Sequence, residues 1–200
     1  MKTFLHVGCG PKRKDQTTRG FFDWNELRFD IDESVQPDFV GTMTDMSNVS
    51  SGCVDAIFSS HNIEHLYPHE VPIAISEFLR VLKPEGFVVI TCPDLQSVCE
   101  LIADDKLIEP AYISPAGPIA PLDILYGHRP QIAQGNYFMA HKCGFTLKVL
   151  NALIQACGFK NIASVRRKAP YFDLWVLATK AEIDVDELKK MALNHFPLGI

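Results

Sequence analysis

The first ten residues restrict the fold more than any other stretch of the chain. Thr3 to Val7 (TFLHV) is a short, mostly apolar run of the kind that forms a strand. It leads directly into Gly8, Cys9 and Gly10, which are followed by a proline, so regular structure is expected to stop there. A strand that runs into glycines at the very start of a chain is typical of nucleotide-binding α/β folds.

The rest of the chain is expected to alternate between strands and crossovers. Apolar runs predict strands, and apolar residues at helical spacing predict helices. Residues 11–25 show no such helical stripe and are predicted to be a loop or a broken helix. The other predicted strands are residues 27–31, 37–40, 53–59, 87–91, 159–166 and 173–179, and the predicted helices are residues 70–82, 95–107, 146–157 and 185–195.

This order predicts the fold class. Strands that alternate with crossovers, followed by two strands close enough to form an antiparallel hairpin, indicate a Rossmann-like α/β fold. Its sheet would be mostly parallel and seven-stranded, with one antiparallel strand and helices on both faces. Ligands of such sheets bind beyond the carboxyl ends of the strands, where the strand order reverses. The loops of interest therefore follow Val7, Ile31, Val40, Ser59 and Thr91.

The length predicts a single domain over residues 1–200, because 200 residues of which 47% are apolar suffice for one buried core. Within it, residues 108–143 carry five prolines and three glycines and are predicted to be irregular. A long irregular stretch in a compact domain is usually a lid or a binding loop. We therefore expect a lid-like insertion over residues 95–145.

Composition limits the partners. A formal charge of -5, from 19 basic and 24 acidic residues, gives no electrostatic reason to expect nucleic acid or an acidic membrane surface. No run approaches the roughly 18 apolar residues that a membrane span needs. The six cysteines show no C-x-x-C pair, and the N-terminus does not read as a signal peptide. We expect a soluble protein of the reducing cytoplasm with a small-molecule partner, and the oligomeric state stays open.

The second predicted strand points to an adenosine cofactor. It carries Asp30, which stands 20 residues after Gly10. A carboxylate at this place can accept hydrogen bonds from both ribose hydroxyls, while the glycines let a ligand approach the backbone. A nicotinamide cofactor is disfavoured, because Arg13 stands where the third glycine of its fingerprint is required and no clear helix follows.

Five segments together carry a family resemblance: FLHVGCGP, RFDID, VGTMTDM, CVDAIFSSHNIEHL and EFLRVLKPEGFVVIT. They resemble the class I S-adenosylmethionine-dependent methyltransferases, particularly the small-molecule branch called type 11. The likeness covers residues 3–92, and HKCGFT and CGF near the end resemble the same group. It implies an enzyme that uses S-adenosylmethionine for in-line transfer of a methyl group to a small molecule.

The resemblance also implies places for the cofactor-binding residues. The glycine turn would enclose the methionine part, the end of the second strand would hold the adenosine, and the end of the fourth strand would lie near the amino group and the sulfonium. The residues are Gly8, Cys9 and Gly10 for the methionine part, Asp30 for the ribose, Ile31, Thr42 and Met43 for the adenine, and Ser60 and His61 for the amino group and sulfonium.

Two positions depart from the family pattern. The family usually has an acidic residue where this chain has His6, and an aspartate where it has Thr42. These departures support an alternative, in which the chain is a non-catalytic, methyltransferase-like module that binds a nucleoside or a partner protein.

Methyl transfer to a hydroxyl, a protonated amine or an acidic carbon requires a base that removes a proton. Histidines suit this role near neutral pH, and the candidates in order of preference are His61, His128 and His141. Three further residues of the insertion are candidates for the acceptor site: Arg129, Asn136 and Tyr137.

The segment HNIEH, His61 to His65, also fits the H-x-x-E-H pattern of inverted zinc peptidases. A zinc site there needs both histidines on one face of a true helix and a third ligand from further along the chain. The segment instead begins at the end of a predicted buried strand, so a peptidase is disfavoured and no metal is expected. Glu64 and His65 are predicted to cap the next helix or to line the cofactor cleft.

Overall fold

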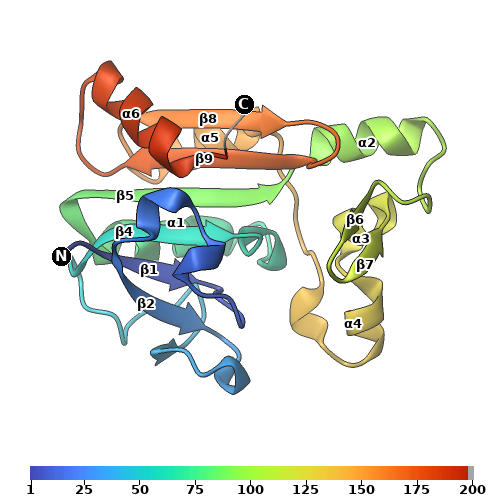
Figure 1. Ribbon diagram of the computed structural model, residues 1–200, viewed down its shortest axis with the longest axis horizontal. Coiled ribbons are helices and arrows are strands. Elements are labelled where there is room, and N and C mark those ends of the chain that lie inside the picture. The colour runs from blue at the N-terminus through green and yellow to red at the C-terminus, as the bar shows by residue number, and fades with distance from the viewer. Residues whose placement is uncertain (198–200) are drawn as a thin grey trace.

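The structure, a computed structural model, describes residues 1–197. Its main feature is a seven-stranded sheet in the order β3-β2-β1-β4-β5-β9-β8, in which β9 runs antiparallel to its neighbours (Figure 1). The predicted Rossmann-like fold is thereby confirmed. The strands are β1 (Thr3–Val7), β2 (Asn25–Asp30), β3 (Phe39–Val40), β4 (Val54–Ser60), β5 (Leu82–Pro93), β8 (Ile162–Arg167) and β9 (Asp173–Thr179).

The strand order reverses between β1 and β4. From β1 the chain builds outward through β2 to β3, whereas from β4 it builds outward through β5 in the other direction. All five of these strands are parallel, so the loops that follow β1 and β4 leave the same edge of the sheet side by side. This reversal is where an open α/β sheet binds its ligand.

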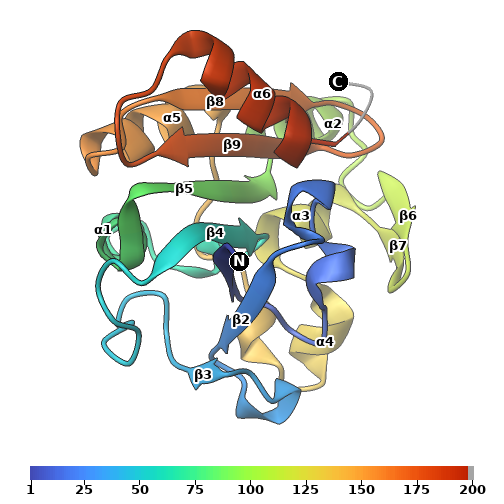
Figure 2. The ribbon, with the colours of Figure 1, turned by 60° about the vertical axis from the view of Figure 1, so that its left-hand side comes forward.

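Helices cover both faces of the sheet. The helices α1 (Val71–Val81) and α5 (Leu147–Ala156) lie on one face, and α6 (Val185–His195) lies on the other (Figures 1 and 2). Helix α1 buries Ile75 and Phe78 completely, and full burial of such side chains contributes about 2–3 kcal/mol each. Within residues 1–197, no helix combines the length and the apolar composition that crossing a bilayer requires.

The segment between β1 and β2 forms two short 3-10 helices, Lys14–Gln16 and Arg19–Phe21, as its lack of an apolar stripe predicts. Phe21 is buried there and stacks on Phe4 of β1 with ring centroids 4.3 Å apart. One aromatic side chain therefore covers sheet surface that a crossover helix would otherwise bury. His195 of α6 also packs on the Phe21 ring, with the two ring centroids 4.4 Å apart.

Four strands differ from their predicted bounds by more than one residue, and one of them, β8, begins at Ile162 and not at residue 159. Strand β2 ends at Asp30, which leaves Ile31 outside the sheet. Strand β3 has only two residues, because the Asp38 side chain, rather than the backbone, accepts the Arg28 amide at 2.7 Å. Strand β5 begins at Leu82, earlier than predicted, because Val54 pairs with Leu82 and the register then shifts so that residues 83–86 bulge out.

The prediction that residues 108–143 are irregular is wrong. They contain a hairpin of β6 (Tyr112–Ser114) and β7 (Gly117–Ile119), the helices α3 (Pro121–Tyr126) and α4 (Arg129–Ala133), and a 3-10 helix, Tyr137–Met139. Prolines begin the two helices instead of preventing them. Helix α2 (Leu95–Ala103), shorter than predicted, packs on α3, and the group lies beyond the carboxyl ends of β4 and β5 (Figure 1).

Gly127 closes the insertion on itself. It pairs with Ala140 in an isolated bridge, and the His141 amide donates to the Tyr126 carbonyl at 3.2 Å. A Cβ on Gly127 would lie 1.9 Å from the Met139 carbonyl oxygen, and its φ is +95°. Only glycine fits this contact without moving backbone.

We expect Gly127→Ala to lower the free energy of unfolding by about 2 kcal/mol, because backbone must move to admit the methyl group. Gly135→Ala is the matched control, since Gly135 has a similar φ of +93° but no atom within 4 Å of the added Cβ. Thermal unfolding and hydrogen exchange of residues 121–141 measure the difference. Equal destabilisation by both variants would show that the close contact at Gly127 does not hold the insertion.

Candidate active site

The loop after β1 turns sharply at two glycines. Gly8 and Gly10 have φ angles of +61° and +51°, which residues with a side chain disfavour. A Cβ on Gly10 would meet nothing within 4 Å, so the backbone borders open space there. Cys9 between them is buried, and burial raises the pKa of its thiol to about 11. Its sulfur is therefore protonated at neutral pH, which fits packing and not nucleophilic attack.

The carboxylate of Asp30 lies beside this loop. Asp30 is buried, and its side chain accepts hydrogen bonds from the backbone amides of Gly10 at 2.7 Å and Asp32 at 2.9 Å. Each carboxylate oxygen has a second lone pair for a ligand hydroxyl. The Asp30 carbonyl in turn accepts the Gly41 amide at 2.9 Å, which brings the loop after β3 alongside.

Arg28 holds two of these loops together. Its buried guanidinium donates to the carbonyls of Val35 at 3.0 Å and Gln36 at 2.8 Å, in the loop after β2, and to the carbonyl of Gly10 in the loop after β1. One rigid, planar group therefore sets the spacing of the two loops. This role of Arg28 was not predicted, although a basic residue two positions before Asp30, at the buried end of β2, could have indicated it.

The residues predicted for the adenine lie along the same edge. Ile31 follows Asp30 directly and exposes 44% of its surface. Thr42 is exposed, and its hydroxyl lies 2.9 Å from that of Thr44. Met43 is partly buried against the main core. An exposed isoleucine next to a buried carboxylate offers an apolar surface to a flat ring.

The side chain of His6 contacts a carboxylate, that of Glu26 in the neighbouring strand β2. His6 Nδ1 lies 2.7 Å from Glu26 Oε1, and the Lys14 amide donates to the other oxygen of Glu26 at 3.0 Å. Burial lowers the pKa of His6, with Glu26 acting against it, so the ring is neutral near pH 7. Glu26 of β2 thus supplies a carboxylate to His6, a contact between two strands that no local sequence pattern indicates.

The loop after β4 begins with a strained residue. His61 has a φ of +56°, a conformation that residues other than glycine rarely adopt and that is most common at functional sites. Ser60 before it shares a hydrogen bond of 2.8 Å with Thr91. Asn62 after it packs on Gly8, where a Cβ would lie 2.0 Å from its Oδ1, and donates to the Val7 carbonyl at 2.9 Å. Asn62 therefore fixes His61 relative to the glycine loop, another role that the sequence analysis missed.

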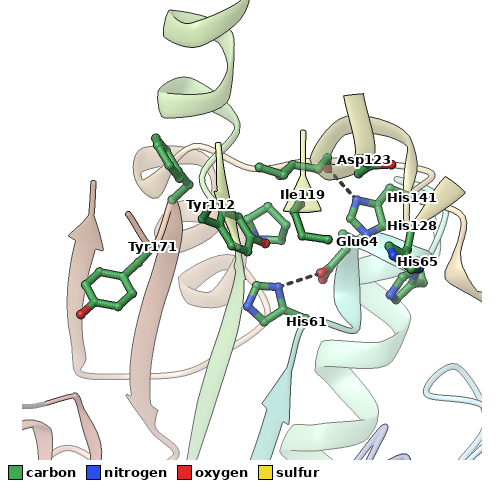
Figure 3. A pocket seen from close by; sticks show the side chains of 12 residues that line it. His61, Glu64, His65, Tyr112, Ile119, Asp123, His128, His141 and Tyr171 are labelled. Carbon is green, nitrogen blue, oxygen red and sulfur yellow. Dashed lines mark hydrogen bonds and ion pairs between the residues drawn. The ribbon is translucent and has the colours of Figure 1, made fainter. Parts of the chain in front are cut away.

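All three histidines proposed as bases line one cavity of about 130 Å³ (Figure 3). His61 comes from the loop after β4, and His128 and His141 come from the insertion. Tyr112 and Tyr171 line the cavity as well. The structure thus brings together side chains from three distant parts of the chain at the carboxyl end of β4.

A second cavity of about 230 Å³ adjoins the first, and Glu64 and His141 line both. Glu64 is 1% exposed. Burial opposes its charged form, but the neighbouring His61, His65 and His141 outweigh burial and lower the pKa of its carboxyl group. Burial lowers the pKa of His141, so an ionised carboxylate faces a neutral imidazole.

The structure separates other residues that the sequence analysis grouped. Arg129 forms an ion pair of 2.6 Å with the buried Asp123, which also caps α3, so its charge is used within the insertion. Asn136 and Tyr137 are exposed and line neither of the two cavities. Of the insertion residues predicted for the acceptor site, His128 and His141 line the first cavity, whereas Arg129, Asn136 and Tyr137 line neither.

The HNIEH segment does not form the α-helix that a zinc peptidase motif requires. Ile63–His65 is a single 3-10 turn, which begins directly after Asn62. Glu64 and His65 both line the first cavity, and neither caps α1, whose N-cap is Glu70.

Comparisons with known proteins agree with the fold. Residues 5–90 match the family model described as a methyltransferase domain. No curated protein matches the chain.

Several solved structures share the fold at low identity. One, from Thermotoga maritima, is described as an S-adenosylmethionine-dependent methyltransferase and possible histamine N-methyltransferase (TM-score 0.60, 14% identity, 90% of this chain and 83% of that chain). A methyltransferase from Methanosarcina mazei gives a TM-score of 0.59 at 15% identity over 90% of this chain and 93% of that chain. The 1,6-didemethyltoxoflavin N1-methyltransferase of Burkholderia thailandensis was solved with bound 1,6-didemethyltoxoflavin and S-adenosylhomocysteine. It gives a TM-score of 0.57 at 15% identity, over 90% of this chain and 71% of that chain.

Proposed function

We propose that the chain is a class I S-adenosylmethionine-dependent methyltransferase and that it methylates a small molecule bound in the cavity of about 130 Å³. The observation that carries the proposal is the position of that cavity. It begins at His61, whose neighbour Asn62 packs on Gly8 of the glycine loop. A ligand in the cavity would therefore lie next to the cofactor site.

The residues present fit S-adenosylmethionine, which supplies an electrophilic methyl group on a sulfonium. Gly10 leaves open space over its backbone, and the buried Asp30 carboxylate keeps lone pairs for two ribose hydroxyls. Ile31 offers an exposed apolar surface for the adenine. In our proposal Gly8 and Cys9 border the methionine part, Thr42 and Met43 the adenine edge, and Ser60 and His61 the amino group and sulfonium.

The enclosure of the cavity supports a small acceptor. Residues from β5, the hairpin and α3 line it, so the insertion covers it on the side away from the sheet. We propose that residues 95–145 act as a lid of the single domain 1–200. The Burkholderia enzyme, which was solved with bound 1,6-didemethyltoxoflavin, supports a small-molecule acceptor. Charge balance supports a partner other than nucleic acid or membrane, and the cysteine pattern supports the reducing cytoplasm.

The residues of the chain have two tasks in the reaction. They hold the acceptor in line with the methyl group, which supplies much of the acceleration. They also accept the proton that the acceptor loses, and His61, His128 and His141 are the candidates. The His141 Nδ1 lies 2.7 Å from the Ile124 carbonyl and donates its proton there, so Nε2 is the nitrogen of this ring that would accept a proton.

We expect the protein to convert S-adenosylmethionine into S-adenosylhomocysteine when the low-molecular-mass fraction of a cell extract is added. The nucleic acid fraction or the protein fraction should not support this conversion. His128→Asn should lower the rate of S-adenosylhomocysteine formation at least tenfold, because loss of a general base lowers a reaction rate by roughly 10²–10⁴-fold. His69→Asn is the control, since His69 is exposed and lines neither cavity. Methyl groups found only in the nucleic acid or protein fraction would contradict the proposal.

A non-catalytic module is disfavoured. Its main support was the missing acids at His6 and Thr42, and at the first of these places Glu26 supplies a carboxylate 2.7 Å from the His6 ring. The same assay separates the enzyme from such a module. A non-catalytic module that binds nucleoside would bind S-adenosylhomocysteine but would not form it from S-adenosylmethionine.

A further inference from the structure

We propose that Glu64, His65 and His141 form a binding site for a divalent transition-metal ion of the first row. Each residue offers one donor atom, and the three donor atoms lie within 4.8 Å of one another (Figure 3). This departs from the expectation, drawn from the sequence, that the chain holds no metal. It does not depend on methyl transfer or on the nature of the acceptor.

Backbone hydrogen bonds hold the three residues together. Glu64 and His65 belong to the 3-10 turn after β4, and His141 belongs to the returning end of the insertion. The amides of Lys142 and Cys143 both donate to the Glu64 carbonyl, at 2.8 and 3.2 Å. The cluster is therefore built from two segments that are fixed to each other.

Both imidazoles are oriented as metal ligands are. His65 Nδ1 lies 3.1 Å from the Ala140 carbonyl, and His141 Nδ1 lies 2.7 Å from the Ile124 carbonyl. A carbonyl can only accept, so each Nδ1 carries the proton and each Nε2 carries a lone pair. Metal-bound histidines commonly donate their other ring nitrogen to such a carbonyl, which fixes the tautomer and the orientation of the ring.

Glu64 supplies a second and independent observation. Its side chain is almost fully buried, yet neither carboxylate oxygen has a hydrogen-bond partner among the described residues. The His61 Nδ1 atom lies 3.4 Å from Glu64 Oε1, a contact without hydrogen-bond geometry (Figure 3). A buried carboxylate without partners is costly, and a bound cation would satisfy it.

The donor set selects the kind of ion. Two imidazoles and one carboxylate suit zinc, cobalt or iron, whereas Mg²⁺ and Ca²⁺ prefer oxygen donors alone. In a tetrahedral site, two donors at about 2.1 Å from the metal lie roughly 3.4 Å apart, so the widest pair must close by up to roughly 1.4 Å. Rotations of the side chains can supply this.

Three protein ligands leave coordination positions open. Glu64 and His141 line both cavities, so the open positions would face space that a water molecule or a ligand oxygen can occupy. The proposed ion therefore lies at the wall between the two cavities and not in a closed structural site.

The test titrates the full-length protein, freed of metal by a chelator and without S-adenosylmethionine, with Co²⁺, Zn²⁺ and Mg²⁺. We expect one Co²⁺ per chain, seen by its visible absorption, displacement of Co²⁺ by Zn²⁺, and no comparable binding of Mg²⁺. Glu64→Gln, which keeps the size of the side chain, and His141→Asn should each weaken Co²⁺ binding at least tenfold. His69→Asn should leave it unchanged.

Two results would overturn the proposal: wild-type protein that takes up no stoichiometric Co²⁺ or Zn²⁺, or a Glu64→Gln variant that binds as tightly as wild type. The wild-type titration decides even if a variant fails to fold. Folding of each variant is checked by circular dichroism. Since the nucleoside is left out, failure of this test leaves the proposed methyl transfer untouched, and failure of the methyl-transfer assay leaves this result standing.

Discussion

Asp30→Ala is expected to bind S-adenosylhomocysteine at least tenfold more weakly than the wild-type protein, a loss of about 1.4 kcal/mol or more. The buried Asp30 carboxylate accepts the Gly10 amide at 2.7 Å and, in our account, two ribose hydroxyls as well. Hydrogen bonds to a charged acceptor contribute about 1.5–3 kcal/mol, and alanine removes all of them. Isothermal titration calorimetry measures the change.

Asp32→Ala is the matched control for this prediction. Asp32 lies two residues further on, and its side chain accepts the Ser34 amide at 2.9 Å within its own turn. Its loss should change the affinity little. Asp30→Asn, which keeps one acceptor oxygen without the charge, should fall between alanine and wild type. An unchanged affinity of Asp30→Ala would remove our placement of the ribose.

Arg28→Met is expected to lower the free energy of unfolding by about 3 kcal/mol and to weaken S-adenosylhomocysteine binding as well. Methionine fills much of the volume but leaves three carbonyls, those of Gly10, Val35 and Gln36, without their donor. Each unsatisfied buried group costs about 1–3 kcal/mol, less where water reaches it. Urea denaturation and calorimetry give the two quantities.

Arg13→Ala controls for the loss of positive charge in the same region, because Arg13 is exposed. It should change stability by less than about 0.5 kcal/mol. If Arg28→Met lost stability but bound the nucleoside with wild-type affinity, the guanidinium would support the fold without positioning the cofactor loops. Such a result would contradict the role that we assign to Arg28.

Much of the sheet and of the cofactor edge could be predicted from the sequence, because the signals are local. The helices α1, α5 and α6 and the strands β1, β4 and β9 begin and end within one residue of their predicted bounds. Apart from the polar helix α6, each has a continuous apolar run or stripe that a single window of sequence contains. The glycine turn and Asp30 were found for the same reason.

The insertion could not be predicted, because its elements are too short to show periodicity. Helices α3 and α4 have six and five residues, less than two full turns. Pro121 and Pro130 favour irregular structure by local pattern, but proline at the first turn of a helix has no hydrogen bond to lose. Short helices begun by proline therefore read as loops.

Long-range contacts at the site were equally beyond local patterns. Nothing in the sequence around Glu64 indicates that the amides of Lys142 and Cys143 donate to its carbonyl and so bring His141 beside it. The HNIEH motif was tested only against a helix, whereas the third ligand that such a motif needs comes from the end of the insertion. The motif contains Glu64 and His65, two of the three proposed metal ligands, but presents them from a 3-10 turn and not from an α-helix.

A crystal structure of the protein with S-adenosylhomocysteine tests the central claim most directly. Our account predicts that the ribose hydroxyls bond to Asp30, that the amino acid part lies along Gly8 to Gly10, and that the sulfur faces the cavity lined by His61 and His128. A nucleoside bound elsewhere, or one whose sulfur points away from that cavity, would contradict it.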